Sequence, residues 1–208
     1  DPIPSRGLGD VYKRQDLKGL KMRFPGFGGE VFKRAGGTPV NIPGGELYTA
    51  MQTGTIDAVE WVGPYNDLAF GFQQVAKYYY YPGWHEPGSM LEFMINIDEW
   101  NTLPPHLQKI VEVAAKAVNQ DLLDEYTASN NRALQELINT HDVQLRRLPD
   151  DVINEFRAIS DDILTSSAEN DADVKKVYES FKKFMGEVRS FNAIAEDAFI
   201  EARNLSEE

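Results

Sequence analysis

The first third of the chain alternates short strand-like runs with short helices that glycines delimit. Residues 16–25, DLKGLKMRFP, lead into a glycine-rich loop, a helix over 30–35 and the strand TPVNI. Residues 43–61 repeat the scheme, with a helix that starts after a glycine pair, stops at Gly54 and leads into a strand over 57–61. Short connections in this order predict a parallel α/β sheet whose ligand lies beyond the carboxyl ends of its strands.

The remaining chain is predicted to be mostly helical. Its longest periodic segment, 105–140, starts at the second residue of the Pro104-Pro105 pair, and at about 1.5 Å per residue it spans on the order of 50 Å. That exceeds the needs of one small domain, so we expect this helix to bridge two lobes. The other expected elements are a helix within 64–77, a strand over 78–81, a long buried strand over 89–100, a strand over 143–148, a helix from 148 with a break over 168–173, and a helix over 174–204.

Composition excludes several classes of function. The net charge of −12 argues against nucleic-acid binding, because a phosphate backbone is bound by basic surface. Without cysteine the chain has no disulfide, thiolate metal site or thiol nucleophile. No apolar run reaches the length of a membrane span. Residues 1–15 contain no apolar core of a secretion signal and end in VYKRQ, which resembles translated sequencing adaptor, so authentic sequence is expected from about Asp16.

Candidate functional residues gather between 57 and 87. Two expected strands end in loops that carry Glu60 and Glu86 among aromatic side chains, a pattern typical of a closed ligand pocket. Each residue taken singly has a simpler explanation, as core, turn or rim. Arg23 lies on the strand before the glycine-rich loop. It either forms an ion pair at the surface or binds a carboxylate through two parallel hydrogen bonds.

The chemistry of the two glutamates stays open at this point. They suit a glycosidase-type pair, which makes a carboxylate-pair hydrolase the alternative function, or they suit oxygen ligation of an alkali or alkaline-earth cation. His85 is either a base or a structural hydrogen bonder. The sequence contains no HExxH, GxSxG or EF-hand motif, and its glycine-rich loop has neither a dinucleotide fingerprint nor a Gly-Lys-Ser/Thr ending.

The chain resembles the DctP-like periplasmic solute-binding subunits of tripartite ATP-independent periplasmic (TRAP) transporters. Three tracts carry the resemblance: KMRFPGFGGEVFKRAGGTPVNIPGGELYTAMQTGTIDAVEW, EWVGPYNDLAFG and KYYYYPGWHEPG. Within that family it is most similar to the branch that binds 2-oxo acids such as pyruvate, or related monocarboxylates such as lactate, together with a metal cation. The likeness covers residues 16–204 and is most specific over 44–87.

The resemblance implies a two-lobed α/β protein that closes on its ligand. It places the family's carboxylate-binding arginine at Arg23, and its metal site, for sodium or calcium, at Glu60, Trp61 and Glu86. Trp61 would also contact substrate, and Tyr65 and Asn66 in the same loop are expected to line the pocket. Such a protein captures its acid in the periplasm and delivers it to membrane subunits, without being an enzyme.

Family members are longer, so the resemblance also implies that this chain is a C-terminal fragment whose first lobe is largely missing. On this view 16–88 form the ligand-binding lobe, 89–140 a crossover strand and the lobe-spanning helix, and 141–208 a C-terminal strand and helices. An apolar stripe at 191–199 predicts a homodimer through the C-terminal helix.

Overall fold

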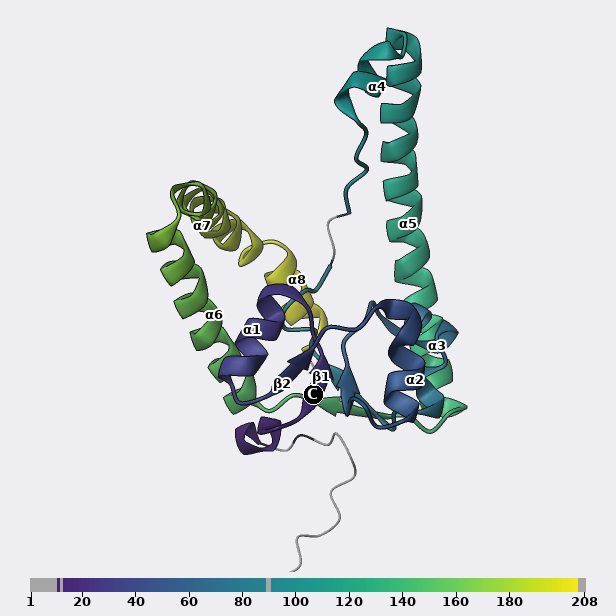
Figure 1. The fold of residues 1–208 in the computed structure, drawn as a ribbon, viewed down its shortest axis with the longest axis vertical. Coiled ribbons are helices and arrows are strands. Elements are labelled where there is room, and N and C mark those ends of the chain that lie inside the picture. The colour runs from purple at the N-terminus through teal and green to yellow at the C-terminus, as the bar shows by residue number, and fades with distance from the viewer. Residues whose placement is uncertain (1–10, 12, 89–90, 206–208) are drawn as a thin grey trace, which may run out of the picture. The chain divides into compact units, whose positions relative to one another are not determined.

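The computed structural model describes residues 11, 13–88 and 91–205 of the 208-residue chain. Its three-stranded sheet is parallel throughout, in the order β2-β1-β3. Parallel neighbours require crossover connections, which α1 and α2 provide, so the predicted α/β architecture is confirmed. The elements are β1 (Lys21–Arg23), α1 (Gly26–Arg34), β2 (Thr38–Val40), a 3-10 turn η2 (Gly44–Glu46), α2 (Leu47–Gln52) and β3 (Ala58–Val59), shown in Figure 1.

The glycine-rich stretch is the first turn of α1, whereas the sequence predicted a loop before a helix over 30–35. Pro25 has an extended backbone and serves as the N-cap residue. A Cβ atom on Gly28 would collide with the Phe24 ring, and one on Gly29 would collide with the Phe24 carbonyl oxygen. These glycines therefore allow the start of α1 to pack directly against the residue that ends the preceding strand segment.

One hydrophobic cluster fixes α2 against the sheet. Leu47 and Ala50 of α2 are buried with Ile56 and Phe72, and partly buried side chains of the strands and of Trp61 pack around them. The spacing of Leu47 and Ala50 places both on one helix face. Gly54 follows α2 with a φ of 69°, the left-handed conformation that favours glycine after a helix.

The helix expected within 64–77 is shorter than predicted. α3 (Pro64–Ala69) stops at Gly71, whose φ of 79° interrupts the helix before the 3-10 turn η3 (Phe72–Gln74). A second, two-stranded sheet follows, in which β4 (Tyr78–Tyr81) pairs in parallel with β5 (Gln144–Arg147). Both strands match the sequence prediction closely.

The long buried strand predicted over 89–100 is wrong. Residues 89 and 90 lie outside the described residues, and 91–96 have neither helix nor strand structure. Leu91 and Met94 are 79% and 84% exposed. Asn96 then caps α4 (Ile97–Thr102) by accepting hydrogen bonds from two backbone N–H groups of its first turn. A segment with alternating apolar residues forms a buried strand only when it lies next to the edge of a sheet. Neither sheet of the described residues includes this segment.

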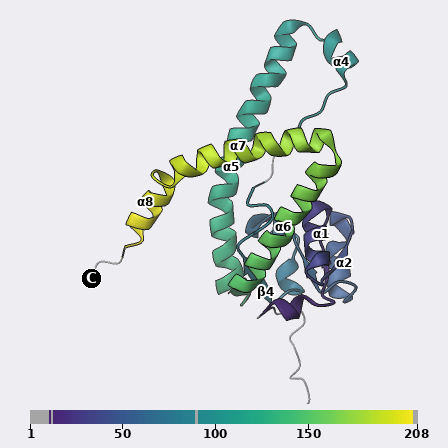
Figure 2. The ribbon, with the colours of Figure 1, turned by 90° about the vertical axis from the view of Figure 1, so that its left-hand side faces the viewer.

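The predicted longest helix is confirmed as α5 (Pro105–Asn139). Figure 1 shows α5 running from the region of α3 to a far end where α4 lies, and Figure 2 shows α4 at that same end. After β5 come α6 (Asp150–Asn170), α7 (Ala172–Asn192) and α8 (Glu196–Arg203), so the helix predicted over 174–204 is divided at residues 193–195 and the break before it is confined to Asp171. None of the described helices is both long and apolar enough to cross a membrane.

The chain divides into two compact units within α6. The first ends at Phe156 and contains both sheets and α5. The second begins at Arg157 and contains the rest of α6 with α7 and α8. Asp171 caps α7 through its side chain, which accepts from the N–H groups of Asp173 and Val174. The domain boundaries at 15, 88 and 140 remain predictions.

Candidate functional site

Three strand ends of the parallel sheet meet at one arginine. Arg23 is the last residue of β1, and Glu60 follows β3, its parallel neighbour. The Arg23 Nη1 pairs with Glu60 Oε1 and lies 3.5 Å from the Glu60 carbonyl oxygen. Its Nε donates to the carbonyl oxygen of Ile42, just beyond β2, at 3.4 Å. The guanidinium therefore lies at the carboxyl edge, where ligands of parallel sheets bind.

The Arg23–Glu60 pair is largely removed from water. Its side chains are 15% and 12% exposed, and a buried charge is tolerated when a counter-charge and hydrogen bonds compensate it. His85 approaches the other oxygen of the same carboxylate, with Nε2 3.5 Å from Glu60 Oε2. The Glu60 carboxylate therefore lies between a guanidinium and an imidazole.

Aromatic contacts hold the loop that carries His85 and Glu86. The His85 ring meets the Phe24 ring edge-on, with centroids 4.6 Å apart. Trp84 stacks on Phe156 of α6 at 4.3 Å. Glu86 is exposed and directly follows His85, the residue that approaches Glu60. Of the two predicted acidic residues, Glu60 thus contacts both Arg23 and His85, whereas the place of Glu86 in the site stays a prediction.

Trp61 adjoins the same cluster. The Arg23 guanidinium lies 5.4 Å from the Trp61 ring centroid, and the ring packs against Phe70 at 5.0 Å. The indole Nε1 is buried without a hydrogen-bond partner among the described residues. A buried unpaired donor is costly, so such an atom marks a place where a ligand oxygen is well accommodated. A Cβ atom on Gly44 would lie 2.6 Å from the ring, so that glycine is required for this ring position.

Tyr65 and Asn66, both on α3, are placed differently from each other. The Tyr65 hydroxyl donates to Glu125 of α5 at 3.3 Å, and its ring meets Tyr126 edge-on at 6.1 Å. Its side chain is therefore engaged by α5. The Asn66 Oδ1 is buried and, within the described chain, has no hydrogen-bond donor, which leaves it free to accept from or to ligate a bound group.

A buried polar pair that joins α3 to β4 was not predicted from the sequence. The Tyr79 hydroxyl donates to Asp67 Oδ2 at 2.5 Å, and Asp67 is 8% exposed. Burial raises the pKa of Asp67 to about 6, although the hydrogen bond from Tyr79 opposes that rise. Burial likewise raises the pKa of Tyr79 above its usual range. The sequence offered no signal for this pair beyond an acidic residue in the first turn of a helix.

The donors at this site suit a hard cation. Glu60, Glu86 and the Trp61 backbone carbonyl are oxygen donors, the type that sodium and calcium take, and the Asn66 amide oxygen is an unpaired acceptor nearby in the chain. In the part of the chain that the structure describes, no three histidine, aspartate or glutamate side chains gather into a metal cluster. A cation held at these residues would need further ligands, such as backbone oxygens or a bound molecule.

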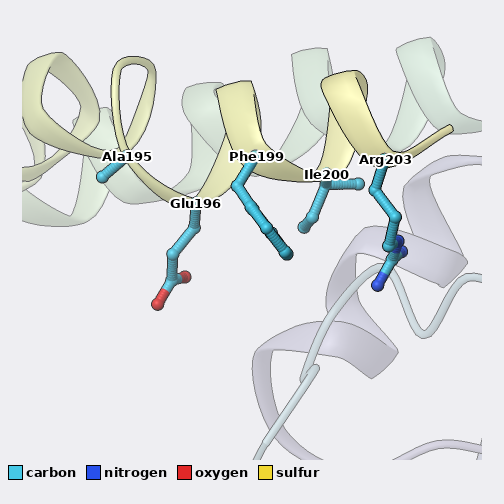
Figure 3. Close-up of a pocket in the computed structure, with 5 residues that line it drawn as sticks. All are labelled: Ala195, Glu196, Phe199, Ile200 and Arg203. Atoms are coloured by element: carbon cyan, nitrogen blue, oxygen red, sulfur yellow. The ribbon is translucent and has the colours of Figure 1, made fainter. Parts of the chain in front are cut away.

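A separate hollow of about 330 Å³ lies along α8. Ala195, Glu196, Phe199, Ile200 and Arg203 line it, as Figure 3 shows. It contains none of the predicted site residues, and its lining is a shallow, mainly apolar stretch of one helix.

A comparison with models of protein families identifies the family of this chain. Residues 8–171 match the DctP family, bacterial extracellular solute-binding protein, family 7. The chain belongs to this family. Its members bind substrates for transporters and are not enzymes, which confirms the non-enzymatic interpretation of the sequence. The comparisons offer nothing in favour of the hydrolase alternative, and both Glu60 oxygens already contact basic side chains.

Several individual proteins of this family are similar to the chain over most of its length. The monocarboxylate 2-oxoacid-binding periplasmic protein of Nostoc is 42% identical over 202 residues, 94% of this chain and 55% of its own length. The TRAP periplasmic solute-binding protein of Colwellia psychrerythraea, solved with calcium and pyruvate, is 40% identical with a TM-score of 0.89, over 94% of this chain and 60% of that one. The Pseudoalteromonas atlantica protein, solved with sodium and pyruvate, is 42% identical with a TM-score of 0.88, over 93% and 59%.

A Bordetella bronchiseptica TRAP solute-binding protein, 36% identical with a TM-score of 0.89 over 93% of this chain and 57% of its own, was solved as a mixed-occupancy dimer with calcium and picolinate. The chain thus spans somewhat more than half the length of the relatives that it matches. The resemblance to TRAP solute-binding proteins predicted from the sequence is confirmed.

Proposed function

We propose that this chain belongs to a periplasmic protein that captures a small monocarboxylate, a 2-oxo acid such as pyruvate or the related lactate, together with a cation, and delivers it to TRAP membrane subunits. The observation that carries the proposal is the convergence of Arg23 and Glu60 at the carboxyl edge of the parallel sheet. Relatives with 40% and 42% identity hold pyruvate with calcium or sodium, which supports the ligand class and both cations.

Arg23 is the residue that we assign to the ligand carboxylate. A guanidinium presents two parallel N–H donors, which match the two oxygens of a carboxylate. Backbone carbonyls of Ile42 and Glu60 hold this guanidinium in place, so it is oriented before a ligand arrives. The low exposure of the site strengthens the attraction, because few water molecules screen it.

Trp61, Tyr65 and Asn66 are assigned to the walls of the pocket. The unpaired indole N–H of Trp61 is a donor for a keto or hydroxyl oxygen. Asn66 offers a buried amide oxygen, and its neighbour Tyr65 is tied to α5. A pyruvate-sized acid has little apolar surface to bury, so these polar contacts and Arg23 must provide most of its affinity.

The cation is assigned to Glu60, Glu86 and the Trp61 carbonyl oxygen. A sodium or calcium ion supplies positive charge that offsets the glutamates and attracts the ligand's oxygens. The chain's own contribution is to hold Glu60 between Arg23 and His85, so that its carboxylate is already ordered. Two carboxylates facing an anion repel it when no such charge lies between them.

The test is titration of pyruvate, by calorimetry, into the chain dialysed against calcium, sodium or chelator. Arg23→Lys keeps the charge but removes the two-pronged geometry, so its affinity should fall about tenfold or more. Arg34→Lys, at an exposed α1 ion pair, is the matched control and should bind as the unmodified chain does. Equal affinity of Arg23→Lys and the control, or undiminished affinity in a chelator buffer that is also free of sodium, would refute these assignments.

We also propose a homodimer through the C-terminal helices. Phe191, Ile194 and Phe199 are 66%, 78% and 66% exposed, and Phe199 lines the apolar hollow of Figure 3. The dimeric Bordetella relative supports self-association as a property within the family. Analytical ultracentrifugation of the chain and of Phe199→Glu tests the proposal, with Phe93→Glu, at a 76% exposed site outside the C-terminal helices, as the control. A single mass shared by all three proteins would remove it.

A further inference from the structure

The first turn of α3 lacks a cap of its own. Gly63 at the N-cap position has no side chain, and Pro64 at the first helical position has no N–H group. The first N–H that needs a partner therefore belongs to Tyr65, directly before Asn66. Most helices satisfy such a group with a serine, threonine or aspartate in the same loop.

Asn130 of α5 provides the missing acceptor from elsewhere in the chain. Its Oδ1 accepts the Tyr65 N–H at 3.0 Å, across 65 residues of sequence. The fit is close, because a Cβ atom on Gly63 would lie 3.2 Å from that same oxygen. Glu125 and Tyr126 add a hydrogen bond and a ring contact to the Tyr65 side chain. One face of α5 thus contacts both the backbone and the side chain of Tyr65.

The position of Asn130 along α5 is set by packing. Tyr126, Asn130, Ala133 and Leu137 recur at three- and four-residue spacing, which places them on one face of the helix. Ala133 and Leu137 are 5% and 2% exposed, so this face is anchored in the first unit. A polar side chain on an otherwise packed stripe is expected to have a specific partner.

We infer that Asn130 is a positioning residue for the acid-binding site, acting as a cap for α3 supplied by α5. The loop that it closes runs from Glu60 and Trp61 through Gly63 to Tyr65 and Asn66, and so carries most of the proposed pocket. Loss of the cap should release this loop and reduce ligand affinity. The inference rests on the proposed function for its ligand, but the cap itself is independent of any ligand.

The experiment compares Asn130→Ala, Asn130→Asp and the exposed neighbour Asn131→Ala. Amide hydrogen exchange is followed over residues 60–70 without ligand, and pyruvate affinity is measured by calorimetry in calcium. Asn130→Ala should speed exchange across the loop and weaken pyruvate binding about tenfold, the size of a typical cap. Asn130→Asp keeps an acceptor oxygen, so its amide exchange and its pyruvate affinity should match those of the unmodified chain. The control Asn131→Ala should change neither the exchange nor the affinity.

A second variant approaches the same contact from the other side. Gly63→Ala introduces a Cβ against Asn130 Oδ1 and should reproduce the faster exchange. Unchanged exchange in Asn130→Ala and Gly63→Ala overturns the cap, and faster exchange with unchanged pyruvate affinity overturns the positioning role. If the unmodified chain does not bind pyruvate, that result counts against the proposed function alone. Amide exchange across residues 60–70 then decides whether Asn130 holds the loop.

Discussion

Replacing Asp67 with asparagine should stabilise the chain at neutral pH and have little effect in acid. Asp67 is 8% exposed, and its Oδ1 has no hydrogen-bond partner in the described structure. Burial disfavours its charged form and raises its pKa from 3.8 to about 6. Asparagine has nearly the shape of a protonated aspartate and keeps an oxygen that accepts from Tyr79.

The size of the expected stabilisation follows from the shift in the pKa of Asp67. About two pKa units correspond to about 3 kcal/mol. Because the folded pKa is the higher one, the folded state binds the proton more tightly, and stability falls as pH rises from about 4 to about 6. Above that window the charged Asp67 lowers the free energy of unfolding by up to about 3 kcal/mol. Asp67→Asn removes this cost, which amounts to roughly 5–10 °C in melting temperature for a chain of this size.

The assay is thermal unfolding of both proteins between pH 4 and pH 8, followed by tryptophan fluorescence. The difference in melting temperature should be small at pH 4 and largest at pH 8. Asp121→Asn, at an exposed site on α5, is the matched control and should show no such trend. A difference independent of pH, or one that grows in acid, would refute the view that Asp67 carries a buried charge at neutral pH.

Three further substitutions test other contacts. Gly44→Val should push the Trp61 indole from its place, because a Cβ there would lie 2.6 Å from the ring, and calorimetry should show pyruvate affinity reduced about tenfold. Phe156→Ala removes the ring stacked at 4.3 Å on Trp84 and should lower the free energy of unfolding in urea by about 3–5 kcal/mol. Tyr79→Phe removes the side-chain donor to the buried carboxylate of Asp67, so its destabilisation should be greater at pH 8 than at pH 4.

Sequence reasoning succeeded where local signals and the fold agreed. Glycine-bounded helices between short strands predicted the parallel sheet, and the double proline predicted the start of α5. It failed for residues 91–100, where apolar alternation predicted a buried strand. Alternation records which residues are suited to burial, whereas a strand also needs an adjacent edge with free N–H and C=O groups. Local sequence contains no information about that edge.

The candidate site shows the same limit. Arg23, Glu60 and Trp61 were predicted together, and they converge because each lies at or just after a strand end, where register brings them to one edge. Asn130 and Tyr79 were missed because their roles depend on contacts across 65 and 12 residues of sequence. A polar residue at a stripe position of α5 was a signal available for Asn130, whereas the sequence offered none for Tyr79.

On the proposed function, the Arg23–Glu60 pair links the binding of acid and cation. A carboxylate that takes the Nη1 donor of Arg23 competes with Glu60, whose side chain is 12% exposed. The displaced glutamate then lacks its main counter-charge, and an uncompensated buried charge costs several kcal/mol. A cation held by Glu60 removes that cost, so each ligand raises the affinity for the other by the same factor. On the proposed function, this coupling accounts for glutamates in an acid-binding site, and it requires that pyruvate alone bind weakly.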